Sequence, residues 1–407
     1  MTTRADLIGY FLAGVEAVAP ERLVSSWLTA HPVAASHVVA IGKAAGGMAV
    51  GASRLVDAEE WLVVAPHDVP VPTGARLVIA GHPTPNEESF AAGRLLVELA
   101  DSMGEEDHLL VLLSGGASSL AEAPTEGISP VDVVRATEIL LASGASIEAV
   151  NAVRGAMSRL KGGGLAALAH PAEVTTLAIS DVVGSDPGAI GSGPTVAGRS
   201  RRAVDVLANL RDVLPRSVVQ AVLADHAVSP TPGEYHVLAD GGTAAEAAAA
   251  AARRDGSPAR VVTTGLTGEA ALVAPRVVED LTRRGGDGIF VYAGETTVTL
   301  DGRGRGGRNQ EAALAAALAL DGQDGMTFLA AGTDGIDGPT ENAGAVVDGT
   351  SAAVMRAAGV DPMEALENHD SACAHESAGT AVITGPTGTN VGDLWLVHRE
   401  PDARTPT

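Results

Sequence analysis

The stretch GETTVTLDGRGRGGRNQE, residues 294–311, decides how we interpret the fold. An apolar segment at 288–293 precedes it and is typical of a strand, and the Ala/Leu-rich sequence that follows to residue 320 predicts a helix. We expect the glycines to leave backbone N–H groups unpaired at the start of that helix, with three arginines beside them. Unpaired amides and the helix dipole both favour an anion. A solvent-exposed flexible loop is the alternative interpretation.

A carboxylate-rich loop follows one helix and one strand later. It reads AGTDGIDGPTENAGA, residues 331–345, and contains Asp334, Asp337 and Glu341. Carboxylates hold divalent metals, and an anion-binding loop nearby suits the phosphates that such a metal accompanies. The two loops together indicate phosphate chemistry with a divalent cation.

Composition limits the class of protein. The 407 residues exceed one typical core, so we expect two domains. The net charge of -23 argues against nucleic acid or an anionic membrane as a partner. No apolar run reaches the roughly 18 residues of a membrane span. The single cysteine, Cys373, excludes an intrachain disulfide and predicts a cytoplasmic enzyme.

Strand, turn and helix patterns alternate along the chain, which predicts an α/β fold with mainly parallel sheets. The stretch 229–233, SPTPG, is the best linker, so we expect domains at 1–230 and 234–407, each with helices on both faces of its sheet. The expected strands are 38–41, 62–65, 76–80, 109–113, 174–179, 235–239, 260–264, 289–293, 298–300, 327–330, 345–347 and 381–384.

Two glycine-rich loops follow expected strands in the first half. Lys43 stands in GKAAGG after the strand at 38–41, in an imperfect dinucleotide fingerprint that is not a Walker A loop. The loop 114–119, SGGASS, has amides and hydroxyls that suit a phosphate or carboxylate, and it lacks the G-x-S-x-G of a hydrolase elbow. Only two lysines occur, Lys43 and Lys161, and both adjoin glycine, which indicates a need for an ammonium there. Chance in a lysine-poor chain is the alternative.

Eight motifs, in order, resemble the class II glycerate kinases with a MOFRL-type C-terminal domain. They are IGKAAGGMA, GHPTPNEES, LLSGGASSL, NAVRGAMSRLKGGGLA, ISDVVGSDPGAIGSGPT, GETTVTLDGRGRGGRNQE, AGTDGIDGPTENAGA and TGPTGTNVGD. The resemblance implies two α/β/α domains with the active site in the cleft between them. It also implies transfer of the γ-phosphate of ATP to the 2-hydroxyl of D-glycerate, with Mg²⁺.

The resemblance also implies site residues. The catalytic group would be Lys43, Lys161, Asp181, Arg308 and Asp334, with the cations on phosphate or carboxylate charge and Asp334 or Asp181 receiving the hydroxyl proton. The substrate-binding group would be Ser114, Gly115, Gly116, Ser118, Asn151 and Arg154, with Arg154 on the glycerate carboxylate. The nucleotide-binding group would be Gly306, Gly307, Asn309, Thr387, Gly388, Thr389 and Asn390. The magnesium ligands would be Asp186, Glu295 and Asp337.

Two other functions stay open at this point. NAD(P)H-dependent reduction of hydroxypyruvate rests on the partial fingerprint at Gly42, although no residue pair suggests a hydride-transfer acid. A small-anion sensor would bind glycerate without turnover. The sequence leaves open which hydroxyl is phosphorylated, which nucleotide is preferred, how adenine is bound and whether the chain is a homo-oligomer.

Overall fold

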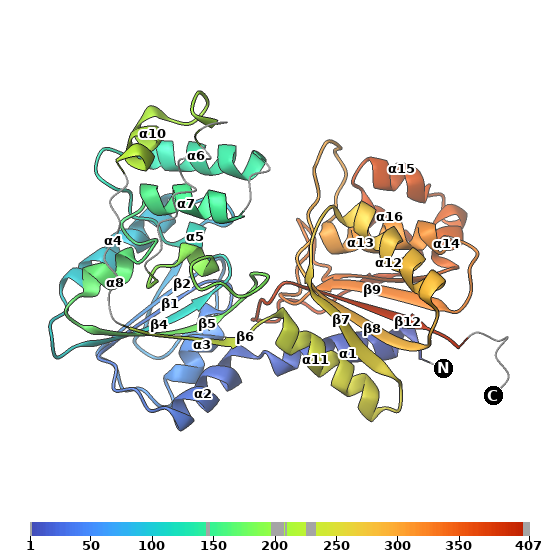
Figure 1. Cartoon of the computed structure of the whole chain (residues 1–407), viewed down its shortest axis with the longest axis horizontal. Helices are drawn as coiled ribbons and strands as arrows, with labels where there is room; N and C mark the ends of the chain where they lie inside the picture. The colour runs from blue at the N-terminus through green and yellow to red at the C-terminus, as the bar shows by residue number, and fades with distance from the viewer. Residues whose placement is uncertain (1, 144–146, 197–206, 208–209, 225–232, 402–407) are drawn as a thin grey trace. The chain divides into compact units, whose positions relative to one another are not determined.

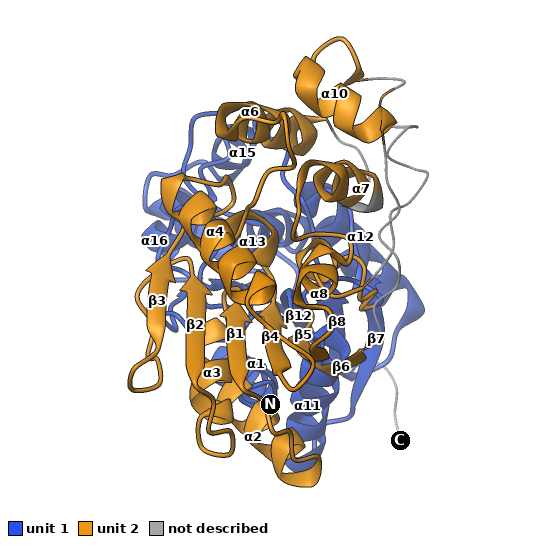
Figure 2. Ribbon diagram, turned by 90° about the vertical axis from the view of Figure 1, so that its left-hand side faces the viewer, with its two compact units in different colours: residues 1–19, 181–184, 239–407 blue, residues 20–180, 185–238 orange. Residues whose placement is uncertain are grey.

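The computed structural model describes residues 2–143, 147–196, 207, 210–224 and 233–401. It divides into two compact units, drawn in two colours in Figure 2. The C-terminal unit comprises residues 1–19, 181–184 and 239–407, and the N-terminal unit comprises residues 20–180 and 185–238. The α/β fold class is confirmed in both units.

The sheet of the N-terminal unit has the strand order β3-β2-β1-β4-β5-β6, and its pairs from β3 to β5 are parallel. Its central strand β4 is an uninterrupted apolar run, buried from Leu109 onward, as a strand covered on both faces requires. The strands are β1 (His37–Ile41), β2 (Glu60–Ala65), β3 (Arg76–Ile79), β4 (His108–Ser114), β5 (Glu173–Ile179) and β6 (Glu234–Ala239).

Helices cover both faces of this sheet (Figure 1). Helix α3 is built from Gly, Ala, Met and Val, and its small side chains allow close packing: a Cβ at Gly51 would lie 2.4 Å from the Glu21 carbonyl oxygen of α2. The helices of this unit are α2 (Pro20–Ala30), α3 (Ala45–Ala52), α4 (Glu87–Asp101), α5 (Ala117–Leu120), α6 (Pro130–Ala142), α7 (Ile147–Met157), α8 (Gly164–Ala169), the 3-10 turn η1 (Ile190–Ser192) and α10 (Arg216–Leu223).

The sheet of the C-terminal unit has the order β11-β10-β9-β12-β8-β7. Along this order β7 and β8 pair in parallel and the other four pairs are antiparallel, so this sheet is mixed where we expected mainly parallel pairing. The strands are β7 (Ala259–Leu266), β8 (Gly288–Gly294), β9 (Met326–Gly332), β10 (Gly344–Asp348), β11 (Ala381–Val382) and β12 (Asp393–Arg399).

Strand β12 accounts for two of the four antiparallel pairs, because it inserts between β8 and β9 in the opposite direction. Its first residue, Asp393, therefore faces the last residues of both neighbours, Gly294 and Gly332. The insertion brings the loops after β8 and β9 and the segment before β12 to the same end of the strands. The sequence patterns did not predict β12, and they predicted a strand at 298–300 that the structure does not form.

Helices α1 and α11 cover one face of this sheet, and α12 and α13 lie on the other (Figure 1). Helix α13 packs its alanines against β9 and β10, since small side chains let a helix approach a sheet closely. The helices are α1 (Arg4–Ala17), α11 (Gly241–Arg254), α12 (Ala270–Arg284), α13 (Arg308–Ala319), α14 (Ser351–Ala357), α15 (Pro362–Glu367) and α16 (Ser371–Ala378).

The compact units divide the chain differently from the expected boundaries at 230 and 234. Helix α1 belongs to the C-terminal unit, where it packs on α11 so closely that a Cβ at Gly14 would lie 2.8 Å from the Ala244 carbonyl oxygen. The segment 181–184 belongs to that unit as well. Residues 229–232 of the expected linker lie outside the described residues. Among the described helices, none is both long and apolar enough to span a bilayer.

Candidate functional site

Each unit contains one group of the residues that the sequence singled out. In the N-terminal unit, the turn after β1 and the loop after β4 are joined by hydrogen bonds. The amide of Lys43 donates to the Gly115 carbonyl oxygen at 2.9 Å, and the amide of Ala44 donates to Ser114 Oγ at 3.0 Å. Gly42 has φ of 130°, and a Cβ there would lie 2.2 Å from Ser114 Oγ, so only glycine fits this turn.

Lys43 lies over the loop 114–119. A Cβ on Gly116 would come within 3.5 Å of Lys43 Cγ and within 3.3 Å of His82 Nε2. Gly116 therefore sits beneath a half-buried cation and an imidazole. The structure brings Lys43, Gly115 and Gly116 together, with His82 beside them. Ser114 is fully buried, and its hydroxyl accepts a hydrogen bond from the β1–α3 turn.

A chain of hydrogen bonds joins Ser118 to helix α7. Asn151 Oδ1 accepts from Ser192 Oγ at 2.9 Å, and Ser118 Oγ lies 2.8 Å from Ser192 Oγ. Because the Ser192 hydroxyl has one hydrogen and gives it to Asn151, Ser118 is the donor in the second bond. Ser192 has φ of 63°, which is rare outside glycine. The structure thus brings Ser118 and Asn151 together through a serine that the sequence did not reveal.

Arg154 and Lys161 form a buried charged cluster with Glu122. The exposed fraction is 9% for Arg154, 3% for Lys161 and 1% for Glu122. Lys161 Nζ pairs with Glu122 Oε2. Burial lowers the pKa of Arg154, and burial also lowers the pKa of Lys161, although Glu122 opposes both shifts. Glu122 was not predicted, and the only sequence signal for it is a single acid inside the otherwise apolar stretch LAEAP.

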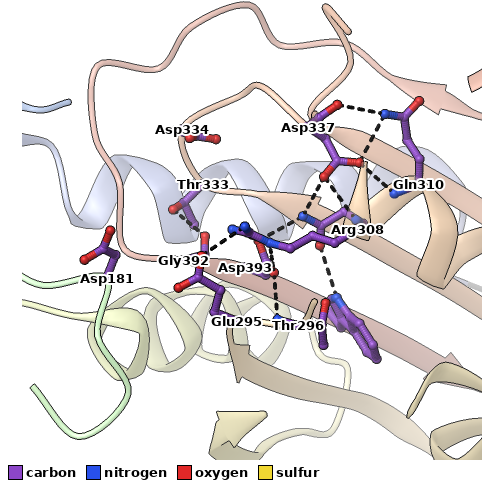
Figure 3. A network of polar contacts seen from close by, with 12 residues as sticks. Asp181, Glu295, Thr296, Arg308, Gln310, Thr333, Asp334, Asp337, Gly392 and Asp393 are labelled. Atoms are coloured by element: carbon purple, nitrogen blue, oxygen red, sulfur yellow. Dashed lines mark hydrogen bonds and ion pairs between the residues drawn. The ribbon is translucent and has the colours of Figure 1, made fainter. Parts of the chain in front are cut away.

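In the C-terminal unit, Arg308 lies at the end of the sheet where β12 begins, next to Asp393. Its Nε and Nη2 donate to the two oxygens of Asp393 at 2.7 and 3.0 Å, and Nη1 lies 2.9 Å from Glu295 Oε1 (Figure 3). Burial lowers the pKa of Arg308, but Asp393 and Glu295 outweigh it and raise the pKa above its ordinary value. Arg308 is therefore a fixed, permanently charged group.

Asp337 occupies the start of helix α13. Its carboxylate accepts from the amides of Asn309 at 3.1 Å and Gln310 at 2.8 Å, and from the Gln310 side chain at 3.1 Å. A Cβ on Gly307 would lie 2.4 Å from the Asp337 carboxyl carbon. The expectation that these amides are unpaired was therefore wrong, because Asp337 is the anion at this helix terminus. Burial raises the pKa of Asp337 to about 6.

The other residues predicted to bind nucleotide lie in the segment before β12. Thr387 Oγ donates to the Thr333 carbonyl oxygen at 2.6 Å, and Thr389 Oγ donates to the Val18 carbonyl oxygen at 2.9 Å. Asn390 Nδ2 donates to Asp181 at 2.9 Å. Thr389 and Asn390 thus hold the segment in place, whereas Gly388 is exposed. Asp181 and Asp334 lie beside the Arg308 network (Figure 3).

The three predicted metal ligands come from both units. Asp186 belongs to the N-terminal unit, while Glu295 pairs with Arg308 and Asp337 caps α13. Within the part of the chain that the structure describes, no three His, Cys, Asp or Glu side chains form a group that could hold a metal ion.

A buried histidine fixes α16 against α13. His375 Nε2 lies 2.8 Å from the Gln310 carbonyl oxygen, which can only accept, so Nε2 carries the hydrogen and Nδ1 accepts from Thr380 Oγ at 2.8 Å. Burial lowers the pKa of His375 to about 4. The neutral ring is thus the folded form at neutral pH.

We expect His375→Gln to weaken the acid sensitivity of folding. The unfolded histidine takes up a proton below its ordinary pKa of about 6.5, while the folded one resists protonation until about 4, so stability falls as the pH drops through that window. From pH 7 to 5 the wild type should lose about 2 kcal/mol more than the variant in urea unfolding. An equal loss in both proteins would contradict this role. Exposed His31→Gln is the control.

Comparisons with known proteins cover most of the chain. A family model described as a domain of unknown function (DUF4147) matches residues 6–224, and the MOFRL family model matches residues 288–393. The D-glycerate 2-kinase of Thermotoga maritima is 38% identical over 397 residues, which cover 94% of this chain and 95% of that relative. The crystal structure of glycerate kinase from Thermotoga maritima matches with a TM-score of 0.86 and 37% identity, covering 97% of this chain and 99% of the other.

A second relative has a different name. A protein of Agrobacterium vitis is 39% identical over 379 residues, which cover 88% of this chain and 98% of the relative, and it is named, provisionally, a hydroxypyruvate reductase. The two names designate different reactions for similar chains.

Proposed function

We propose that this chain, which belongs to the class II glycerate kinase family, transfers the γ-phosphate of ATP to the 2-hydroxyl of D-glycerate. The observation that carries the proposal is the 38% identity to a D-glycerate 2-kinase over 94% of the chain. At that similarity and coverage the chain is a glycerate kinase. ATP as the donor and 2-phosphoglycerate as the product are our more specific proposals.

We assign the hydroxy acid to the group in the N-terminal unit. Arg154 suits the carboxylate because a planar guanidinium can donate to both oxygens. Ser118 and Asn151, ordered through Ser192, suit the hydroxyl groups of glycerate. Lys43 over the glycine loop supplies a positive charge for the phosphoryl group in transfer.

We assign the nucleotide to the group in the C-terminal unit. Arg308 is oriented by two carboxylates and suits the phosphates of ATP, with Gly388 as an exposed backbone contact. Side-chain hydrogen bonds fix the conformation of that segment, and they come from Thr387, Thr389 and Asn390. In the transfer, the glycerate oxygen forms a bond to the γ-phosphorus as the bond to the β-phosphate oxygen breaks. The hydroxyl proton passes to Asp334 or Asp181, and ADP is the leaving group.

We propose that magnesium enters with the nucleotide. Mg²⁺ is commonly held by substrate phosphates, several waters and only one or two carboxylates. In that mode, one or two of the carboxylates Asp186, Glu295 and Asp337 would complete the coordination of the ion. We also propose a cytoplasmic location, which the single cysteine supports.

The reaction class can be tested with two assays on the purified chain. We expect ADP release that requires D-glycerate, and no change in the fluorescence of added NADH or NADPH. A kinase needs only positioning and positive charge around the phosphates, and both units supply such groups. Glycerate-independent ADP release would contradict the proposal, and NADPH-dependent loss of hydroxypyruvate would contradict it and favour the reductase.

A further inference from the structure

The buried cluster in the N-terminal unit has an uneven charge. It contains two cations, Arg154 and Lys161, and one anion, Glu122. Lys161 and Glu122 contact each other directly. The net charge of the Lys161–Glu122 pair is zero, whether the shared proton is on the amine of Lys161 or on the carboxylate of Glu122. The cluster therefore keeps one net positive charge, and that charge is on Arg154.

Arg154 is the member of the cluster that has no direct ion pair with Glu122. Within the described ranges, its guanidinium makes no hydrogen bond or ion pair, although it is 9% exposed and its pKa is influenced by Glu122. A buried charge with no direct partner is costly, because it has lost much of its hydration and only the charge of Glu122, at longer range, compensates it. An anion bound beside Arg154 would supply the missing direct contact. A second buried atom, Glu122 Oε1, also lacks a hydrogen-bond partner among the described residues.

From this arrangement we propose that Lys161 is a positioning residue: it holds Glu122 in a neutral pair and so leaves Arg154 available for a carboxylate of the substrate. The proposal rests on the proposed function, and it changes the role of Lys161 from a cation that contacts the substrate to a counter-ion. Without Lys161, the nearest compensation for Glu122 is Arg154. The two would then neutralise each other, and the positive charge that attracts the ligand would be lost.

This balance of charges predicts an unusual rescue. Lys161→Met leaves Glu122 to pair with Arg154, so the KM for D-glycerate should rise at least about 30-fold, comparable to the loss of a desolvated charge contact. The double variant Glu122→Gln/Lys161→Met removes both members of the neutral pair and restores one net positive charge on Arg154. Its KM should return to within about fivefold of the wild type. A directly catalytic lysine could not be replaced by removing a second residue.

The decisive experiment measures kcat and KM for D-glycerate, and equilibrium binding of D-glycerate by calorimetry without ATP, in the wild type and these variants. Glycerol, which lacks the carboxylate, is the comparison ligand and should bind weakly to all of them. Glu126→Gln removes an exposed acid from the same loop and is the matched control, with KM expected unchanged. Thermal unfolding of each variant identifies any that fail to fold.

Recovery of D-glycerate binding in the double variant supports the proposal. An unchanged KM in Lys161→Met, or a folded double variant that binds as poorly as the single one, overturns it. If the double variant does not fold, Glu122→Asp/Lys161→Arg keeps a neutral pair and must retain the KM within about fivefold, or the proposal fails. Because binding is read without ATP, a wild type that binds D-glycerate but releases no ADP would refute the proposed function alone.

Discussion

Replacing Arg308 by alanine is expected to lower kcat for glycerate phosphorylation by about 10²- to 10³-fold. The guanidinium is the fixed cation of the C-terminal group, held by Asp393 and Glu295. A phosphoryl group in transfer carries negative charge on its outer oxygens, and removing an oriented cation loses stabilisation that water cannot replace. Steady-state kinetics of ADP release measures the effect.

The same substitution should also destabilise the fold. Asp393 is fully buried and accepts two hydrogen bonds from Arg308, so its carboxylate would keep only weaker donors such as Asn309 Nδ2. Breaking a buried pair by removing one partner costs about 3 to 5 kcal/mol. The double variant Arg308→Ala/Asp393→Asn removes the unpaired charge and should recover part of that stability, but not kcat. Recovery of kcat would show that Arg308 acts only through folding.

Replacing Lys43 by alanine is the second large effect, with kcat expected to fall at least about 10²-fold and stability expected to change by less than about 0.5 kcal/mol. Lys43 lies over Gly116, half-buried, at the start of the turn that leads into α3. The chain carries a net charge of -23, so a local cation must outweigh a repulsive field for an anionic substrate.

The control for Lys43 is Arg54→Ala. Arg54 is an exposed cation just after α3, and its partner Glu21 is exposed too. The net charge of the protein changes equally in both variants. A loss of activity in Lys43→Ala alone places the effect at the site, whereas equal losses would mean that only the overall charge matters. Near-normal turnover in Lys43→Ala would remove this residue from the chemistry.

The sequence predicted the N-terminal sheet well, because its buried strands are short, mostly apolar runs, and β1 and β4 lead directly into glycine turns. It failed at β12, although DLWLVHR is largely apolar, because the preceding TGPTGTNVGD was interpreted as a terminal loop. That error hid Asp393 as the partner of Arg308. Strand insertion at the end of a chain depends on contacts with β8 and β9, which local periodicity does not contain.

The site was predictable in residue type but not in pairing. Glycines, arginines and carboxylates near residues 302–311 and 332–342 predicted a polar site, and the structure joins several of them in one hydrogen-bonded network. Nothing local could show that Asp337 caps α13, since the two lie 27 and 28 residues apart. The pair of Glu122 and Lys161, separated by 39 residues, was hidden for the same reason. Long-range pairs decide which charges remain available to a ligand.

The most direct test of the central claim is to incubate the purified chain with D-glycerate, ATP and magnesium and to identify the product. Phosphorus NMR reports the position of the new phosphate, and coupling to enolase reports the 2-phosphate alone. A glycerate 2-kinase should release ADP in step with an enolase signal. ADP release without that signal would contradict the 2-hydroxyl as acceptor, and no ADP release from glycerate would contradict the kinase assignment itself.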